Sequence, residues 1–120
     1  MNPKLRELLD RYCEEYSDFA GVELSDVNSR GHGKNVPIHI AVQVGADADV
    51  ELLIAEGADV NKPGEMGLTP LHYAAMEGRA HIATLLLKSG ANSNTRDMDG
   101  LTPSDWARNL GHTDILRLIK

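Results

Sequence analysis

The first twenty residues combine apolar and charged side chains at the spacing of an amphipathic helix. Asn2 can cap this helix, Pro3 suits its first position and Gly21 is a plausible stop. The apolar residues fall at steps of three and four, which places them on one face: Leu5, Leu8, Leu9, Tyr12, Tyr16 and Phe19. The pattern predicts a helix over residues 1–20 whose apolar face covers the element that follows it.

Short helical patterns come in pairs through the rest of the chain, and glycine divides and ends them. Gly45, Gly78 and Gly111 divide the pairs and lie 33 residues apart. Gly57 and Gly90, which end the second member of a pair, keep the same step. A fixed period of this length is typical of a solenoid, in which each unit stacks on its neighbours.

A proline keeps the same step and begins the first member of each pair: Pro37, Pro70 and Pro103. The clearest copy reads T-P-L-H-Y-A-A over residues 69–75, and weaker copies begin at Val36 and Thr102. With its period, this run resembles the ankyrin repeat family. The resemblance implies an all-α fold, an ankyrin-repeat solenoid of helix-turn-helix repeats with hairpin-like tips and an N-terminal capping helix.

The repeat step also predicts how the chain is divided. Asp26-Val27-Asn28 lies 33 residues before Asp59-Val60-Asn61, so the step reaches back into the first segment. We expect a single ankyrin-repeat domain over residues 1–120, with these parts: an N-terminal capping helix and degenerate repeat at 1–30, repeat 1 at 31–63, repeat 2 at 64–96 and a truncated C-terminal repeat at 97–120.

Two departures from the family pattern fall at the start of repeat 1. Val36 replaces the threonine whose hydroxyl caps the helix, at a cost of about 1 kcal/mol. Lys34 replaces the glycine of the tip, which predicts a looser first tip. The resemblance also implies that His39 and His72 are structural, with rings that join backbone groups of adjacent repeats.

Composition narrows the class of partner. Hydrophobic residues make up 42% of the chain, which is enough for a packed domain. The chain is acidic, with a net charge of −6, and this argues against nucleic acid because phosphates are neutralised by a basic face. The negative charge is concentrated in residues 1–63, which favours encounter with a basic protein. Cys13 is the only cysteine, and we expect no signal peptide, no contact with a membrane and a cytoplasmic location.

No group of residues predicts chemistry. His39 and His72 lie one repeat apart, but zinc requires three or four converging donors. The paired acids at 47 and 49, and at 97 and 99, come with no nucleophile and read as solvated turns or helix faces. We therefore expect no enzyme activity, no catalytic or metal-ligating residue, no cofactor and no small-molecule substrate.

The resemblance places the partner on a concave face built from the tips and the exposed side of each first helix. Met66, Leu68, Met98 and Leu101 are expected there as exposed apolar side chains, which favour protein binding. Leu68 and Leu101 could instead pack between tips, and Trp106 could lie in the core. Carried over by position, the candidate protein-binding residues are His32, Asn35, Gln43, Glu65, Met66, Leu68, Tyr73, Met76, Glu77, Met98, Asp99, Leu101, Trp106 and Asn109.

These features predict a non-enzymatic protein–protein interaction module that blocks or scaffolds a partner protein. A small acidic chain of this shape, with no effector domain of its own, resembles an inhibitor or immunity protein that neutralises a toxin enzyme. The alternative is a structural or regulatory subunit of a larger complex. A histidine-based metal protein or enzyme is a third hypothesis.

Overall fold

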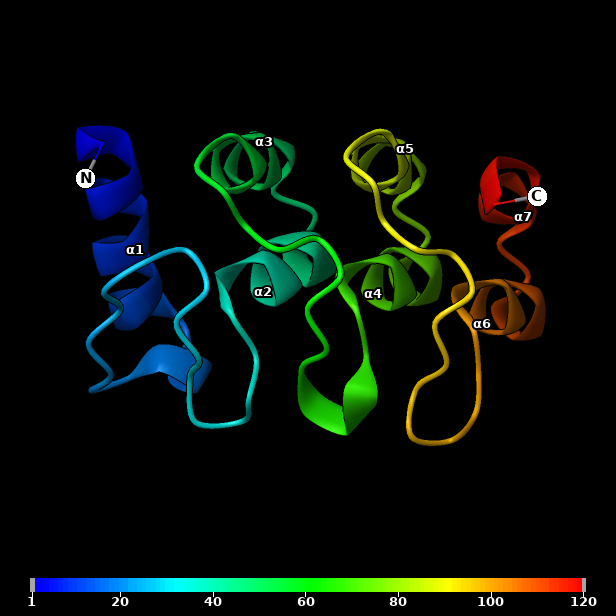
Figure 1. Ribbon diagram of the computed structural model, residues 1–120, viewed down its shortest axis with the longest axis horizontal. Coiled ribbons are helices and arrows are strands. Elements are labelled where there is room, and N and C mark those ends of the chain that lie inside the picture. The colour runs from blue at the N-terminus through cyan, green and yellow to red at the C-terminus, as the bar shows by residue number, and fades with distance from the viewer. Residues whose placement is uncertain (1, 120) are drawn as a thin grey trace.

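Helices arranged in two rows make up residues 2–119, the part of the chain that the computed structural model describes, and this part contains no β-strand. After α1 (Pro3–Glu15), the pairs are α2 (Pro37–Val44) with α3 (Asp47–Ala55), α4 (Pro70–Glu77) with α5 (Ala80–Lys88), and α6 (Pro103–Leu110) with α7 (Thr113–Ile119). The helices α2, α4 and α6, which we call the first helices, form the first row, and α3, α5 and α7 form the second row (Figure 1). The predicted all-α solenoid is confirmed.

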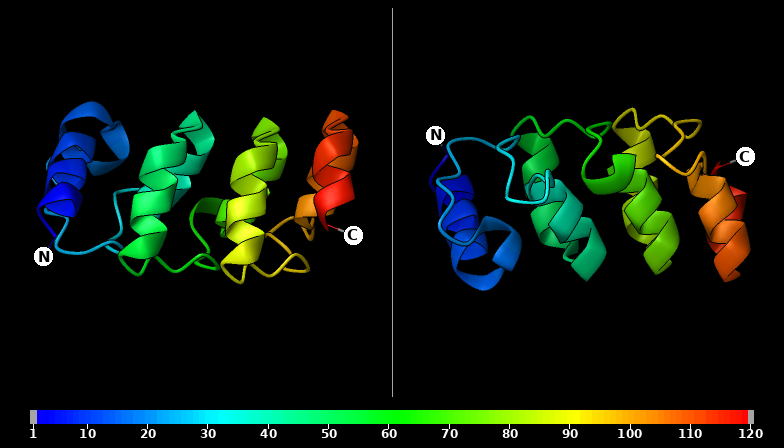
Figure 2. Two further views of the ribbon diagram at one scale, coloured as in Figure 1. Left: turned by 90° about the horizontal axis from the view of Figure 1, so that it is seen from above. Right: turned by 90° about the horizontal axis from the view of Figure 1, so that it is seen from below.

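The loops between pairs gather at one end of the helices and project past the first row (Figures 1 and 2). Two connecting segments contain 3-10 turns: η1 (Ser17–Phe19) lies between α1 and α2, and η2 (Glu65–Gly67) lies between α3 and α4. None of the helices within residues 2–119 combines the length and the hydrophobicity needed to span a membrane.

The N-terminal helix α1 forms the lid that its apolar stripe predicted, although it is shorter than expected. Its start is capped by Asn2, whose Oδ1 accepts the N–H of Lys4 at 2.8 Å. It ends at Glu15 rather than near residue 20, and the chain continues into η1. Polar contacts also join α1 to the first pair: the Tyr12 hydroxyl donates to Oδ2 of Asp49 in α3 at 2.9 Å.

The second and third pairs begin with the threonine caps that the sequence predicted. The hydroxyl of Thr69 accepts the N–H of His72, and that of Thr102 accepts the N–H of Asp105. Val36 has no hydroxyl, so the first helix begins without this bond. Each first helix ends at a left-handed glycine, as expected from the repeated step: Gly45, Gly78 and Gly111.

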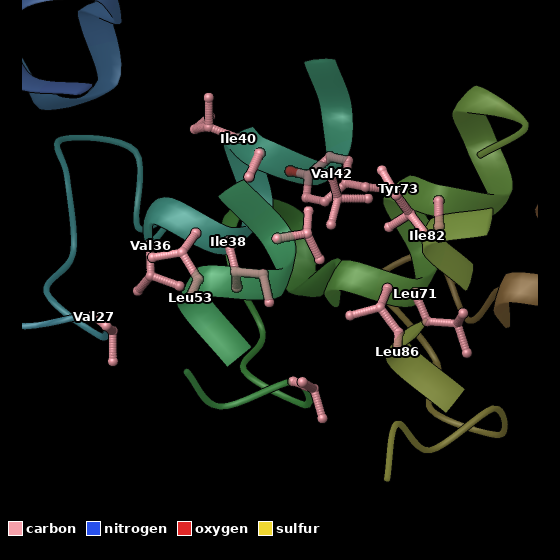
Figure 3. Packing of buried hydrophobic residues seen from close by; sticks show 14 of the residues in the cluster. Val27, Val36, Ile38, Ile40, Val42, Leu53, Leu71, Tyr73, Ile82 and Leu86 are labelled. Atoms are coloured by element: carbon pink, nitrogen blue, oxygen red, sulfur yellow. The ribbon is translucent and has the colours of Figure 1, made fainter. Parts of the chain in front are cut away.

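The core runs along the whole stack between the two rows. Ile38 and Leu71 of the first row and Leu53 and Leu86 of the second row are fully buried (Figure 3). Ala74 and Ala75 are also fully buried, in the central helix α4. Small side chains allow the neighbouring helices to approach α4 closely, because a larger side chain in a packed core forces its neighbours apart.

Asparagine side chains link neighbouring repeats at the 33-residue step. Asn61 accepts the N–H of Asn92 at 2.7 Å and donates to the carbonyl of Gly90 at 3.1 Å. One repeat earlier, Asn28 makes the same two contacts, with Asp59 and Gly57. These bonds fix the spacing between repeats beside the tips.

A second set of links joins the first helices at their other end. The Arg79 guanidinium donates to the carbonyl of Gln43 at 3.0 Å, and one repeat later the His112 ring donates to the carbonyl of Met76 at 3.2 Å. Arg79 and His112 thus occupy the same repeat position, and each donates to a carbonyl of the preceding first helix. The C-terminal ends of α4 and α6 are therefore each held to the preceding first helix.

Candidate functional site

Three tips share one backbone design. We define the first, second and third tips as residues 31–35, 64–68 and 97–101. The N–H of the first residue of each tip donates to the carbonyl of the fifth, over 2.7 to 2.9 Å: Gly31 to Asn35, Gly64 to Leu68 and Asp97 to Leu101. The fourth residue is left-handed in every tip, with φ of 73° at Lys34, 72° at Gly67 and 78° at Gly100. Lys34 therefore does not open the first tip, which closes like the other two.

Arginines that the sequence analysis did not single out support two of these tips. Arg30 donates to the carbonyl of Lys34, and Arg96 donates to the carbonyl of Gly100 at 2.8 Å. The arginines directly precede the first and third tips, at the repeat position that Pro63 occupies before the second tip. Their shared step was a signal that could have identified them.

Met66 and Met98 are exposed apolar residues on adjoining tips, and we call them the tip methionine pair. The N–H of Met98 donates to the carbonyl of Met66 at 3.0 Å. The Met98 side chain lies against Gly67, where a Cβ atom would be 3.2 Å from Met98 Cγ. Met98 is 75% exposed and Met66 is 49% exposed. The expectation of exposed apolar side chains at these two positions is confirmed.

Met66 is held in a conformation that disfavours its side chain. Its φ is 59°, in the left-handed region where a non-glycine residue costs about 1 kcal/mol. The same repeat position in the other tips, Gly33 and Asp99, lies outside that region. Strain of this kind persists where the surrounding structure imposes it, and it concentrates at functional sites.

Other predicted residues are accessible at the tips and at the far ends of the first helices. Those that are exposed are His32, Glu65, Glu77, Asp99 and Asn109. Val44 and Leu110 are also exposed, by 47% and 50%, at the repeat position of Glu77. Val44, Glu77 and Leu110 thus form one row across the first helices, which we call the first-helix row.

Three predicted contact residues are buried, which corrects the expectation that their side chains are exposed. Leu68 is only 9% exposed, because its side chain turns under the second tip into the core. Asn35 is 2% exposed and bonds to groups on both sides of it. Tyr73 is 4% exposed, packs edge-on against His39, and has a pKa that burial raises. These side chains support the tips from beneath and are not presented to a partner.

The remaining predicted residues are half-buried: Gln43, Met76, Leu101 and Trp106. The first three also accept hydrogen bonds through their carbonyls, Gln43 and Met76 in the links between first helices and Leu101 from the ring of His72. The indole of Trp106 donates to Asp97 at the base of the third tip. These residues combine support for the fold with partial exposure.

His39 and His72 use one ring nitrogen at the start of their own helix and the other to reach a later segment of the chain. His39 Nδ1 accepts the N–H of Val36 at 2.9 Å, and Nε2 donates to the carbonyl of Lys62 at 2.7 Å. His72 repeats the first bond, with its Nδ1 accepting the N–H of Thr69, but its Nε2 donates to a different repeat position, the carbonyl of Leu101 at 2.9 Å. Burial lowers the pKa of His39 to about 4 and lowers that of His72 as well. Both rings therefore act as neutral structural links at neutral pH.

Metal-binding geometry is not formed by the side chains that the structure describes. Within residues 2–119, no three or more His, Cys, Asp or Glu side chains come together as a cation site would require. The accessible side chains at the second and third tips include apolar Met66 and Met98 and acidic Glu65 and Asp99, which suit contact with another macromolecule.

Comparison with known families gives one match. A family model described as "Ankyrin repeats (3 copies)" matches residues 19–120, which is most of the chain. Its match begins ahead of the first clear proline-marked helix. No curated protein matches the sequence.

Proposed function

Since the chain belongs to the ankyrin repeat family and is therefore a protein–protein interaction module, we propose that it works by occupancy. It binds one partner protein with its tips and first-helix row. Binding blocks the working surface of that partner or holds the partner in a complex. The mechanism requires a rigid surface and no chemical step.

The tip methionine pair is the observation that carries this proposal. Two exposed apolar side chains adjoin across neighbouring tips, and Glu65 and Asp99 are exposed beside them. Apolar clusters with a polar rim mark protein-binding surfaces. Methionine suits such a surface, because its flexible thioether adapts to the shape that it meets. The strained φ of Met66 adds support, since a glycine there would relieve the strain but remove the side chain.

Inhibition is the form of this function that we favour. In this form the chain is a stoichiometric inhibitor or immunity protein that covers the active site of a basic enzyme, such as a toxin, in the cytoplasm. Its support is electrostatic: the net charge of −6 lies in residues 1–63 and would speed encounter with a positively charged protein.

A photo-crosslinking amino acid at position 66 or 98, introduced into the protein in its native cells, tests the binding surface. Both positions should crosslink to one stoichiometric protein, identified by mass spectrometry. Position 118 is the matched control, because Leu118 is also an exposed apolar residue but lies in the second row, away from the tips (Figure 1).

Charge substitutions then test whether the contact matters for affinity. Met66→Glu with Met98→Glu should weaken binding to the captured partner, whereas Leu118→Glu should not, and both should unfold within about 1 kcal/mol of the unsubstituted chain. Equal binding by the two variants would remove the tips from the proposal. For the inhibitor form, co-expression should restore growth of cells that the partner alone arrests.

A further inference from the structure

Two carboxylates converge over Gly33 between the first and second tips. A Cβ atom at Gly33 would lie 3.6 Å from Glu65 Oε2 and 3.9 Å from Asp18 Oδ2. Gly33 lies outside the left-handed region, so the backbone does not demand glycine there. Its missing side chain leaves an open space, the Gly33 notch, with Asp18 and Glu65 as its acidic walls.

Buried Asn35 bonds to the carboxylate of Asp18 and to the backbone of Glu65. Its Nδ2 donates to Asp18 Oδ2 at 3.3 Å, and its Oδ1 accepts the N–H of Glu65 at 3.0 Å. Tyr73 reaches the same oxygen from below at 3.5 Å. One amide that is 2% exposed thus fixes the capping segment and the second tip relative to each other. The Asp18 wall and the backbone that carries Glu65 are therefore fixed by the folded core, and the exposed Glu65 side chain completes the notch from the second tip.

The negative charge of the notch is not neutralised within residues 2–119. Neither Asp18 nor Glu65 takes part in an ion pair there. The nearby Arg30 guanidinium is directed to the carbonyls of Lys34 and Pro63. Lys34 is exposed beside the notch, and the His32 ring donates away from it, to the carbonyl of Ala20.

We propose that the Gly33 notch receives a lysine or arginine side chain of the partner, beside an apolar side chain that sits on the tip methionine pair. The inference rests on the proposed function and names the chemistry of its partner: a protein segment with a basic residue next to an apolar one. Glu65 and Met66 are consecutive, so the acidic and apolar subsites adjoin. Opposite charge gives such a contact its register and specificity more than its affinity.

Random peptides displayed on phage provide a probe while the partner is unidentified. Peptides are selected on the intact chain, and those that fail to bind Met66→Glu with Met98→Glu are kept as tip-dependent binders. These should be enriched in Lys or Arg beside an apolar residue. Asp18→Asn with Glu65→Gln should weaken their binding about fivefold, the effect expected for losing two exposed charge contacts.

The matched control removes the same charge elsewhere. Glu7→Gln with Glu14→Gln alters two exposed acids of α1 and should leave tip-dependent binding within about twofold, because salt screens distant charges. Gly33→Lys gives an independent check: it supplies the cation from within the chain and should abolish the preference for basic peptides. Thermal unfolding of each variant establishes that it is folded.

The outcomes separate this inference from the function on which it rests. Tip-dependent peptides without basic residues, or peptides that bind Asp18→Asn with Glu65→Gln normally, would overturn the notch and leave the tip surface intact. Equal weakening by the α1 control would overturn it in favour of overall charge. Failure to obtain any tip-dependent peptide would count against the tip surface itself, and the notch with it.

Discussion

The indole Nε1 of Trp106 donates a hydrogen bond of 2.7 Å to Oδ2 of Asp97. The other oxygen of Asp97 accepts the N–H groups of Asp99 and Leu101, at 2.9 and 3.0 Å. Burial opposes ionisation of this carboxyl, but the hydrogen bonds outweigh it, so the pKa of Asp97 lies below its ordinary value. One buried carboxylate therefore closes the third tip, which carries Met98, and ties it to α6.

Removing this carboxylate should loosen the third tip. Asp97→Ala should lower the free energy of unfolding by about 2 kcal/mol, because two backbone N–H groups and the indole lose their acceptor. Trp106→Phe removes one bond and should cost about 1 kcal/mol. Urea unfolding of both single variants and the double variant measures the coupling. The double variant should lose less than the two single losses added together, and strict additivity would contradict the link.

Acid should weaken the stack in a defined pH window because of His39. Its pKa falls from the ordinary 6.5 to about 4 on folding, so the unfolded chain takes up the proton first. The contribution of the neutral His39 ring to the free energy of unfolding is complete above pH 6.5 and declines as the pH falls towards 4. The total loss is about 3 kcal/mol, at roughly 1.4 kcal/mol per pKa unit. The lowered pKa of His72 acts in the same direction. Urea unfolding at a series of pH values measures this dependence.

A variant without the titrating ring provides the control for this window. His39→Gln should be less stable at pH 7, because it loses links to Val36 and Lys62, yet its stability should change less between pH 6.5 and 4. An unchanged pH dependence in this variant would show that other groups cause the acid response.

The repeat step predicted the helices because each marker has a direct conformational effect. Proline presets φ at the start of each first helix, and Gly45 and Gly78 adopt the left-handed conformation that ends it. The burial of Leu68 was one of two alternatives that the sequence left open. Leu101 is apolar at the same step, but Asn35 holds that position in the first tip, so periodicity alone did not decide between packing and exposure.

Other parts of the site could not be predicted from the 33-residue period. Asn35 is buried through its bonds to Asp18 and Glu65, and Asp18 belongs to the capping segment, which carries no repeat marker at that position. The left-handed φ of Met66 was equally hidden, because sequence patterns assign that conformation to glycine. The notch thus depends on contacts that only the folded chain creates.

Substitution of Lys34 measures how much a left-handed conformation at a non-glycine tip residue lowers the free energy of unfolding. Lys34→Gly should raise the free energy of unfolding by about 0.5–1 kcal/mol, because glycine adopts a φ of 73° without steric penalty. Gly100→Lys is the reverse control, since a Cβ there meets nothing within 4 Å and only the conformational cost remains. Urea unfolding should show changes of opposite sign. No gain from Lys34→Gly, together with a loss from Gly100→Lys, would mean that the Lys34 side chain compensates its own strain.

Asn61 and Asn94 share a residue type and a repeat position but differ in the hydrogen bonds that their side chains make. Asn61 bridges to Gly90 and Asn92, whereas the Asn94 side chain makes no such bond within residues 2–119. Asn61→Ala should therefore cost about 1–2 kcal/mol in urea unfolding, because the N–H of Asn92 loses its acceptor. Asn94→Ala should stay within about 0.5 kcal/mol, as surface changes do. Equal losses would mean that these asparagines act on their own turns and do not hold the repeats together.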